Sequence, residues 1–204
     1  MPLVYDLPPT SGPLKQGEIL ADIWEHRPLQ APIAIDQDAP FEFRPIKHPL
    51  MIVMTAVCDL EWDYKARFAD ETAEQHGTAG VVEHDRPAEP DNDPGLVPHV
   101  LLCELYEKGN IRVLIKGHEL WRRIQQNQDE RYHRFGQASI GDPSAAELPE
   151  LFLDFRKTLS LPTQAIYDGL DKGGVRRIAV VPPVYIHDLM HRFYGFLSRV
   201  GVPD

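Results

Sequence analysis

The chain contains few cysteines, fewer basic than acidic residues and no long apolar segment. Its two cysteines, Cys58 and Cys103, lie far apart, which argues against a disulfide scaffold and favours the cytoplasm. No run approaches the about 18 apolar residues of a membrane-spanning helix, and the N-terminal residues show neither a basic start nor an apolar signal core. We therefore expect neither membrane insertion nor secretion. The 31 acidic and 21 basic residues give a net charge of −10, which disfavours indiscriminate binding to nucleic acid or anionic membranes.

The composition is otherwise that of a folded domain. Of the 204 residues, 43% are hydrophobic, enough for a core, and 19 are prolines, which fit strands joined by firm turns better than a helical bundle. We expect a Pro-rich tail over 1–14 and a single domain over 15–204. Eight acidic residues lie between Asp70 and Asp93, with Arg86 as the one base. This composition predicts an exposed, flexible acidic insertion at about 70–97.

Hydrophobic patterns predict several strands. Alternating or continuous apolar stretches predict strands over 17–26, 50–60, 97–109, 131–138, 148–163 and 173–183. The proline-punctuated stretch 28–49 is expected to be loop with one short strand. Within 148–163, Leu151, Leu153 and Phe155 share one face, and Phe152 and Asp154 share the other.

Two segments have helical spacing. Residues 117–128 carry an inward stripe of Leu120, Trp121 and Ile124. Residues 184–201 have a longer stripe that ends at Gly201, a C-terminal cap; its members are Ile186, Leu189, Met190, Phe193, Leu197 and Val200. The order of elements predicts an α+β fold, a small, strongly bent antiparallel sheet or barrel with an inserted helix and a C-terminal helix.

The segment "HDLMH", His187 to His191, is a candidate for part of a metal site. His187 and His191 are four residues apart on one helical face, as in zinc-binding helices. The acid between them is Asp188 instead of Glu, and a third ligand is not evident. Both histidines border the apolar stripe, so we interpret them as its polar flank and expect no metal and no cofactor.

The stretch "VMTAVCDLEWD" ends an apolar run in acidic residues. In an extended strand Cys58 and Asp59 point to opposite faces, whereas Asp59, Glu61 and Asp63 share one face that could present carboxylates to a cation. A Cys58 nucleophile would need a base such as His48 or His99. Two further interpretations remain open. In one, Cys58 is a core residue and the acids follow because the strand has reached the surface; in the other, Asp59 binds a ligand at the strand end.

A basic stretch follows, from Lys108 to Arg134, with seven bases against three acids and several aromatic residues. Charge for phosphates and flat rings for unstacked bases are typical of surfaces that bind single-stranded RNA. The candidate RNA-binding residues are Lys116, His118, Trp121, Arg122, Arg123, Arg131, Tyr132 and Arg134. The alternative is a solvated helix face whose arginines pair with the acidic insertion.

The order of these pieces resembles the MazF/PemK-like toxin superfamily of SH3-like barrels with a C-terminal helix. The segments that carry the resemblance are "QGEILADIW", "HPLMIVMTAVCDL" and the long stretch from Leu151 to Gly201. The chain is also similar to an uncharacterised bacterial group that shares a strand-end Cys-Asp and a closing Arg-Val-Gly-x-Pro, here Arg199 to Pro203.

Active members of the superfamily are metal-independent endoribonucleases and are usually homodimers, so the resemblance implies the same for this chain. They use an arginine of an Arg-Pro motif and a threonine or serine on the following strand. Carried over by position, the arginine becomes His48 and the threonine falls near Cys103, while Arg44 precedes a proline four residues earlier. Together with Asp59 these are the candidate catalytic residues.

Because both expected catalytic positions have changed, we expect an altered nuclease site. The leading hypothesis is a macromolecule-binding module, regulatory or toxin-related, with a protein partner in bacterial stress or phage defence, a setting that the resemblance implies. One alternative is a metal-independent endoribonuclease that cleaves single-stranded RNA. Another is an enzyme centred on Cys58, Asp59 and Glu61.

Overall fold

Two β-sheets form the centre of the molecule. The computed structural model describes residues 4–29, 42–68, 95–141 and 147–199. The larger sheet is antiparallel, in the order β5-β8-β4-β3-β2-β9. Its strands are β2 (Glu18–Pro28), β3 (Phe43–Val53), β4 (His99–Glu107), β5 (Tyr132–Phe135), β8 (Leu151–Pro162) and β9 (Arg176–Val180). The smaller sheet joins β1 (Val4–Tyr5), β6 (Ala138–Ile140) and β7 (Glu147–Leu148).

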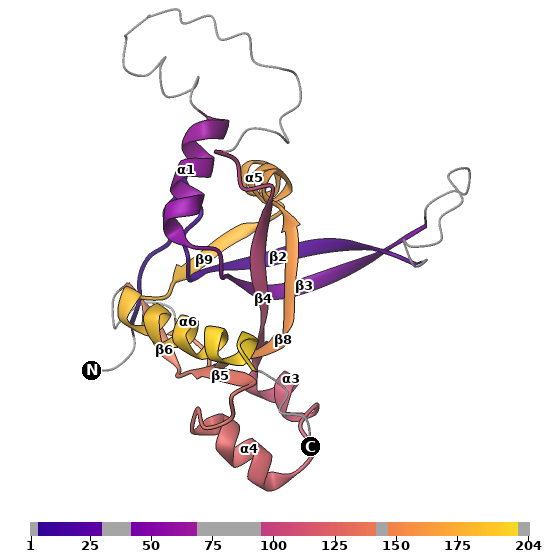
Figure 1. The fold of residues 1–204 in the computed structure, drawn as a ribbon, viewed down its shortest axis with the longest axis vertical. Coiled ribbons are helices and arrows are strands. Elements are labelled where there is room, and N and C mark those ends of the chain that lie inside the picture. The colour runs from indigo at the N-terminus through magenta and orange to yellow at the C-terminus, as the bar shows by residue number, and fades with distance from the viewer. Residues whose placement is uncertain (1–3, 30–41, 69–94, 142–146, 200–204) are drawn as a thin grey trace, which may run out of the picture.

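Helices cover both faces of the larger sheet. Those in the described ranges are α1 (Val57–Arg67), α3 (Lys108–Arg112), α4 (His118–Gln125), α5 (Thr163–Asp171) and α6 (Pro183–Leu197). Strands β4 and β8 run across β2 and β3, with α6 at one side of the crossing and α1 and α5 near one end (Figure 1). The predicted α+β class, with its bent antiparallel sheet, inserted helix and C-terminal helix, is confirmed, and over the described residues the sheets stay open and do not close into a barrel.

The alternation of β8 divides the core. Leu151, Leu153 and Phe155 are fully buried in the cluster beneath α6, whereas Phe152 points the other way and packs on α4, as predicted. A third cluster lies under α1 and α5 and includes Leu60 and Ile166. Burial of apolar area in these clusters is the main stabilising contribution to the fold.

Helix α6 has the predicted inward stripe. Ile186, Leu189, Met190 and Phe193 are buried, and Ile186 approaches the backbone of Gly17, which has a φ of +83° and no Cβ in the way. The helix ends at Leu197, which is exposed, before the predicted cap at Gly201. Val200 and Gly201 lie outside the described residues.

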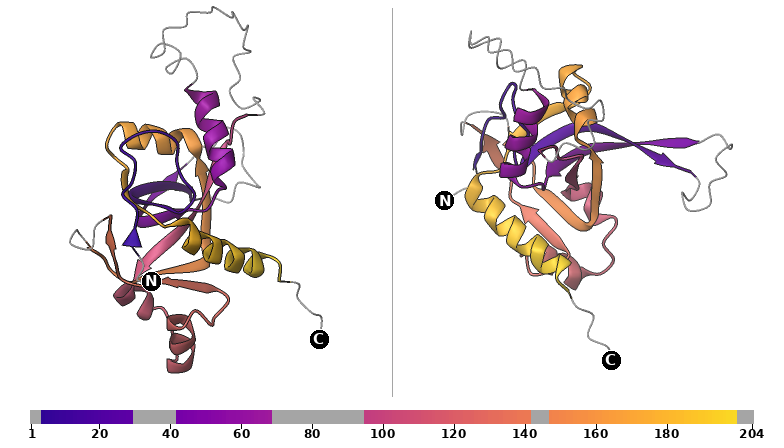
Figure 2. Two further views of the ribbon diagram at one scale, coloured as in Figure 1. Left: turned by 90° about the vertical axis from the view of Figure 1, so that its left-hand side faces the viewer. Right: turned by 45° about the horizontal axis from the view of Figure 1, so that its top comes forward.

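The β2–β3 hairpin bends where Asp22 faces Pro49. Asp22 has a φ of +64°, and the register passes from Ala21–Leu50 to Ile23–His48 without a pair between Asp22 and Pro49. A positive φ is not a strand conformation, so Asp22 interrupts the regular ladder at this point. Beyond the bend the two strands continue as a two-stranded arm, residues 23–28 and 43–48, which we call the β-ribbon. It extends away from the rest of the molecule in Figure 1 and in the right panel of Figure 2.

The prediction of a strand over 50–60 is wrong in its second half. Strand β3 ends at Val53, and α1 begins at Val57. Leu60 and Tyr64, four residues apart, pack into the core below α1, and Asp59 lies in the first turn while Lys65 and Arg67 lie in the last. This charge order suits the helix dipole. The alternating face shared by Asp59, Glu61 and Asp63 therefore does not exist.

Three further findings differ from expectation. Helix α5 begins at Thr163, the last residue of a predicted strand, and continues through residues for which the sequence pattern predicts no element. The segment predicted as a tail packs into the body, since Tyr5 and Leu14 are fully buried. The short strand expected within the proline-punctuated stretch is not separate, because β3 begins at Phe43 and continues to Val53. Most of the predicted acidic insertion, residues 69–94, lies outside the described residues.

Candidate functional site

His48 is held between two carboxylates on neighbouring strands. Its Nε2 lies 3.1 Å from Glu25 Oε2 on β2, and its Nδ1 lies 3.4 Å from Glu104 Oε1 on β4. The register pairs His48 with Ile23, so that Glu25, two residues further along β2, shares its face. Three central strands are thus joined through one imidazole, which is 5% exposed.

The two glutamates favour the charged imidazole. The hydrogen bond to Glu104 is the largest influence on His48; burial opposes it, the bond to Glu25 reinforces it, and together they raise the pKa of His48 above its ordinary value. Burial favours the neutral acid at Glu104, but hydrogen bonds from His48 and Tyr106 hold its pKa below the usual range. His48 therefore carries positive charge to a higher pH than a free histidine does.

Two more side chains extend this network. Arg27 donates from Nε and Nη2 to the two oxygens of Glu25 at 3.0 and 2.9 Å and lowers the pKa of that carboxyl. The Tyr106 hydroxyl donates to Glu104 Oε2. We call His48, Glu25, Glu104, Tyr106 and Arg27 the His48 network. Both ring nitrogens of His48 have partners. This geometry suits a charged side chain that links neighbouring strands better than it suits a general acid or base that is free to meet a substrate.

The other predicted catalytic residues do not join His48. Cys103 is fully buried beneath α6, its thiol donates to the Asp154 carbonyl at 3.5 Å, and burial strongly raises its pKa. Arg44 lies on the β-ribbon opposite Arg27. Asp59 is exposed on α1. It is Glu104, next to Cys103 in sequence, that reaches His48.

The predicted strand-end site is distributed around α1. Cys58 is exposed and its Sγ lies 3.5 Å from Asp59 Oδ1, and Glu61 is exposed as well. Asp63 is fully buried: it accepts Arg67 Nε at 2.9 Å and the Val97 N–H at 2.7 Å. Asp63 therefore fastens α1 to the segment that leads into β4.

The predicted RNA-binding residues lie on and around α4 and β5, but the rings of Trp121 and Tyr132 are buried. Trp121 is buried against Phe152, with ring centroids 5.3 Å apart, and Tyr132 is buried with its hydroxyl accepting Arg156 Nη2 at 2.7 Å. Lys116 and His118 are exposed. Among these candidates His118 alone offers an exposed ring, so the surface has charge but few of the rings on which unstacked bases stack.

The arginines of this surface are paired with acids. Arg122 contacts Glu119 at 2.7 Å, and Arg123 and Arg131 both contact Asp129, at 3.7 and 3.2 Å. These partners lie in the same part of the chain, so the acidic insertion is not needed to neutralise them. Asp129 is a single carboxylate shared by two arginines, and Lys116 is exposed, so the pairing reduces the positive charge of this surface without removing it.

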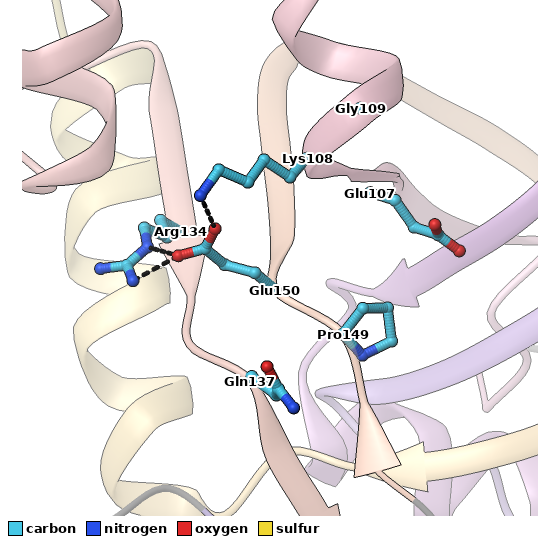
Figure 3. Close-up of a pocket in the computed structure, with 7 residues that line it drawn as sticks. All are labelled: Glu107, Lys108, Gly109, Arg134, Gln137, Pro149 and Glu150. Carbon is cyan, nitrogen blue, oxygen red and sulfur yellow. Dashed lines mark hydrogen bonds and ion pairs between the residues drawn. The ribbon is translucent and has the colours of Figure 1, made fainter.

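A cleft of about 520 Å³ lies beside this surface. Figure 3 shows Lys108 and Arg134 converging on Glu150, with Lys108 Nζ 3.2 Å from Oε2 and Arg134 Nε 2.6 Å from Oε1. Burial opposes the effect, yet Arg134 and Lys108 hold the pKa of Glu150 below its usual range. Both cations are already engaged, which argues against an anion site here.

A second groove, of about 580 Å³, runs along β2 beyond the end of β9. Five consecutive β2 residues, Asp22 to His26, form one side, and the end of β8 together with α5 forms the other. Glu25 belongs both to this groove and to the His48 network. The groove could not be predicted from the sequence, because β2 and α5 are far apart in the chain and only the fold brings them together.

Among the described residues no group of three or more His, Cys, Asp or Glu side chains is arranged to hold a metal ion. Within the same ranges no helix is long and apolar enough to cross a membrane. No protein-family model matches the chain, and no curated protein matches it in sequence.

Proposed function

We propose that the chain is a protein-binding module and that the β-ribbon is its recognition element. The observation that carries the proposal is the exposure of large apolar side chains on the β-ribbon, which extends away from the rest of the described residues. Trp24 is 53% exposed, Phe43 is 52% exposed and Leu29, just past the ribbon, is 58% exposed. Clustered apolar exposure of this kind is typical of protein interfaces.

One face of the β-ribbon carries Trp24 and Phe43, whereas the same alternation places Leu29 on the opposite face. Because register partners share a face, Trp24 and Lys47 lie together with His26 and Pro45 and with Pro28 and Phe43. Lys47 Nζ lies 5.9 Å from the centre of the Trp24 ring. A two-stranded ribbon is marginally stable by itself in water, so its length beyond the bend is better explained by contact with a partner than by the needs of this fold.

The condition of the predicted nuclease residues supports the same proposal. His48 has both nitrogens occupied, Cys103 is buried, the rings of Trp121 and Tyr132 lie in the core, and carboxylates compensate part of the charge of the basic surface. The resemblance to MazF/PemK-like toxins suggests a toxin-related or regulatory setting in bacterial stress or phage defence.

Two exposed tryptophans allow a matched test. Partners captured from a lysate of the producing cells are identified, purified and titrated against the wild-type chain, Trp24→Ser and Trp62→Ser; Trp62 is 70% exposed on α1. We expect Trp24→Ser to weaken binding roughly thirtyfold, as loss of a tryptophan hot spot does, and Trp62→Ser to bind as wild type. Equal affinity of all three chains would refute the proposal.

An endoribonuclease remains the second candidate, because the two glutamates keep His48 charged to higher pH and could make it a proton donor. The test is incubation with a long single-stranded RNA, in EDTA and then with Mg²⁺, on a denaturing gel. Cleavage that is lost in His48→Gln, or in Arg122→Glu combined with Arg123→Glu, would establish this function. The protein-binding proposal predicts intact RNA in every lane.

A further inference from the structure

Strand β2 has a free edge where β9 stops. Strand β9 pairs with β2 only from Glu18 to Ala21, and its end is fixed by Arg176, whose Nη2 lies 2.7 Å from Asp22 Oδ2. From Ile23 to Pro28, β2 is paired with β3 alone among the described strands. Its other edge borders the groove of about 580 Å³.

The backbone polarity of this edge follows from the ladder. Leu29 N–H donates to the Glu42 carbonyl at 2.9 Å, which makes these two residues a hydrogen-bonded pair. Such pairs alternate with non-bonded pairs in an antiparallel ladder. The residues of the non-bonded pairs, Trp24 and His26, therefore point their N–H and C=O groups away from β3, toward the groove side.

The opposite edge of the β-ribbon is protected. The same alternation turns Pro45 and Pro49 of β3 outward, opposite His26 and Asp22, and a proline has no N–H to offer an added strand. On β2 the outward proline is Pro28, at the far end of the strand, so the outward positions Trp24 and His26 both keep their N–H groups. One edge of the ribbon is thus closed to strand pairing, while the edge beside the groove is open.

The far wall of the groove is apolar. Leu161 from the end of β8, Ile166 from α5 and Val175 before β9 line it, and all three belong to the core cluster under α1 and α5. The groove lies within the range of about 300–1,000 Å³ that is typical of ligand pockets. An unpaired strand edge beside an apolar wall is the arrangement that strand addition uses.

The charges of the groove select an uncharged occupant. Asp22 is paired with Lys47 and Arg176 at 2.7 Å each. Glu25 is paired with Arg27 and His48. The acids that line the groove are therefore already compensated, and a charged side chain in the occupant would find no free counter-charge there.

We propose that an extended, uncharged, apolar segment of a partner protein adds to β2 as a further strand, with its backbone bonded to Trp24 and His26 and alternate side chains against Leu161, Ile166 and Val175. This inference rests on the proposed protein-binding function and names the chemistry of the partner.

The test uses peptide display on the purified full chain. Short random peptides are selected on the wild-type chain, and the enriched peptides are titrated against His26→Pro, His26→Ala and Ala165→Trp. His26→Pro removes the outward N–H, whereas His26→Ala keeps it and loses the same exposed side chain. Ala165, an exposed residue of α5 that lines the groove, becomes large enough to fill it when replaced by tryptophan.

We expect enriched peptides rich in Val, Ile and Thr, bound equally by the wild type and His26→Ala. Binding should fall roughly tenfold in His26→Pro, as loss of a strand hydrogen bond requires, and also in Ala165→Trp. Unchanged melting temperatures show that the variants fold. Charged consensus peptides, no enrichment, or equal binding by all variants would overturn the proposal.

Two other occupants give distinct outcomes. A wild-type dimer that becomes monomeric in His26→Pro would make the occupant a second copy of the chain. Competition between the peptides and single-stranded RNA would make it nucleic acid. Either result overturns the inference.

The captured partner separates this inference from the proposed function. If Trp24→Ser loses the captured partner while His26→Pro and Ala165→Trp keep it, strand addition fails and the protein-binding function stands. If Trp24→Ser binds that partner as the wild type does, the proposed function fails.

Discussion

His48 Nε2 lies 3.1 Å from Glu25 Oε2, next to the bend at Asp22 from which the β-ribbon extends. The same imidazole contacts Glu104 on β4 at 3.4 Å. Because the exposed ribbon is joined to the sheet at this point, the His48 network fixes the base of the proposed recognition element.

This network predicts a pH dependence of stability. The pKa of His48 is raised in the folded chain, so its stabilising contribution is complete below the pKa of the unfolded residue, about 6.5, and is lost as the pH rises through the raised value. The free energy of unfolding of the wild type should therefore fall toward that of His48→Gln over this range. Urea unfolding of both chains at a series of pH values measures the difference.

The difference between the two chains is needed because His133 acts in the opposite direction. Burial, with a smaller effect of Arg192, lowers the pKa of His133 to about 3. Its proton uptake on unfolding therefore destabilises the fold as the pH falls below about 6.5. Both chains share this effect, so it cancels. A difference that stays constant across the range would contradict the assigned network.

Two aspartates of α1 should behave differently. Asp63 is fully buried and accepts Arg67 Nε at 2.9 Å, so Asp63→Ala leaves a cation without its partner and should cost about 3–5 kcal/mol of unfolding free energy. Asp59 is exposed, and Asp59→Asn should change stability by less than about 0.5 kcal/mol. Chemical denaturation measures both. Equal effects would mean that the Asp63–Arg67 pair does not hold α1 in place.

The two cysteines should differ in reactivity. Cys58 is exposed, whereas Cys103 is buried and its pKa is strongly raised, which keeps the thiolate scarce. Iodoacetamide should modify Cys58 alone in the folded chain and both cysteines in urea, as peptide mass spectrometry would show. Rapid labelling of Cys103 in the folded chain would instead restore it as a candidate nucleophile.

Local patterns predicted much of the fold. The alternation of Leu151, Leu153 and Phe155 fixed both faces of β8, and the stripe of Ile186 to Phe193 identified α6. Helix α1 was missed because its first residues prolong an apolar strand, and the contacts that favour the helix are with distant residues such as Tyr167, 5.7 Å from Tyr64 between ring centroids.

The candidate site was harder to predict. His48 was identified from a resemblance, but its partners Glu25 and Glu104 lie 23 and 56 residues away in sequence, and only the order of strands brings them together. The basic stretch suggested an RNA-binding surface because its aromatic residues were assumed to be exposed. Trp121 and Tyr132 are instead buried by contacts with Phe152 and Arg156, which lie on a later strand. Side-chain type alone did not distinguish core rings from stacking rings.

Deuterium exchange of the full chain, alone and with its captured partner, tests the central claim most directly. The outward N–H groups of Trp24 and His26 should exchange rapidly in the free chain and become protected in the complex, because they gain hydrogen bonds. The amides of α1 around Trp62 should be unchanged and serve as the internal control. Protection confined to α4 and β5, with the β-ribbon unaffected, would contradict the account.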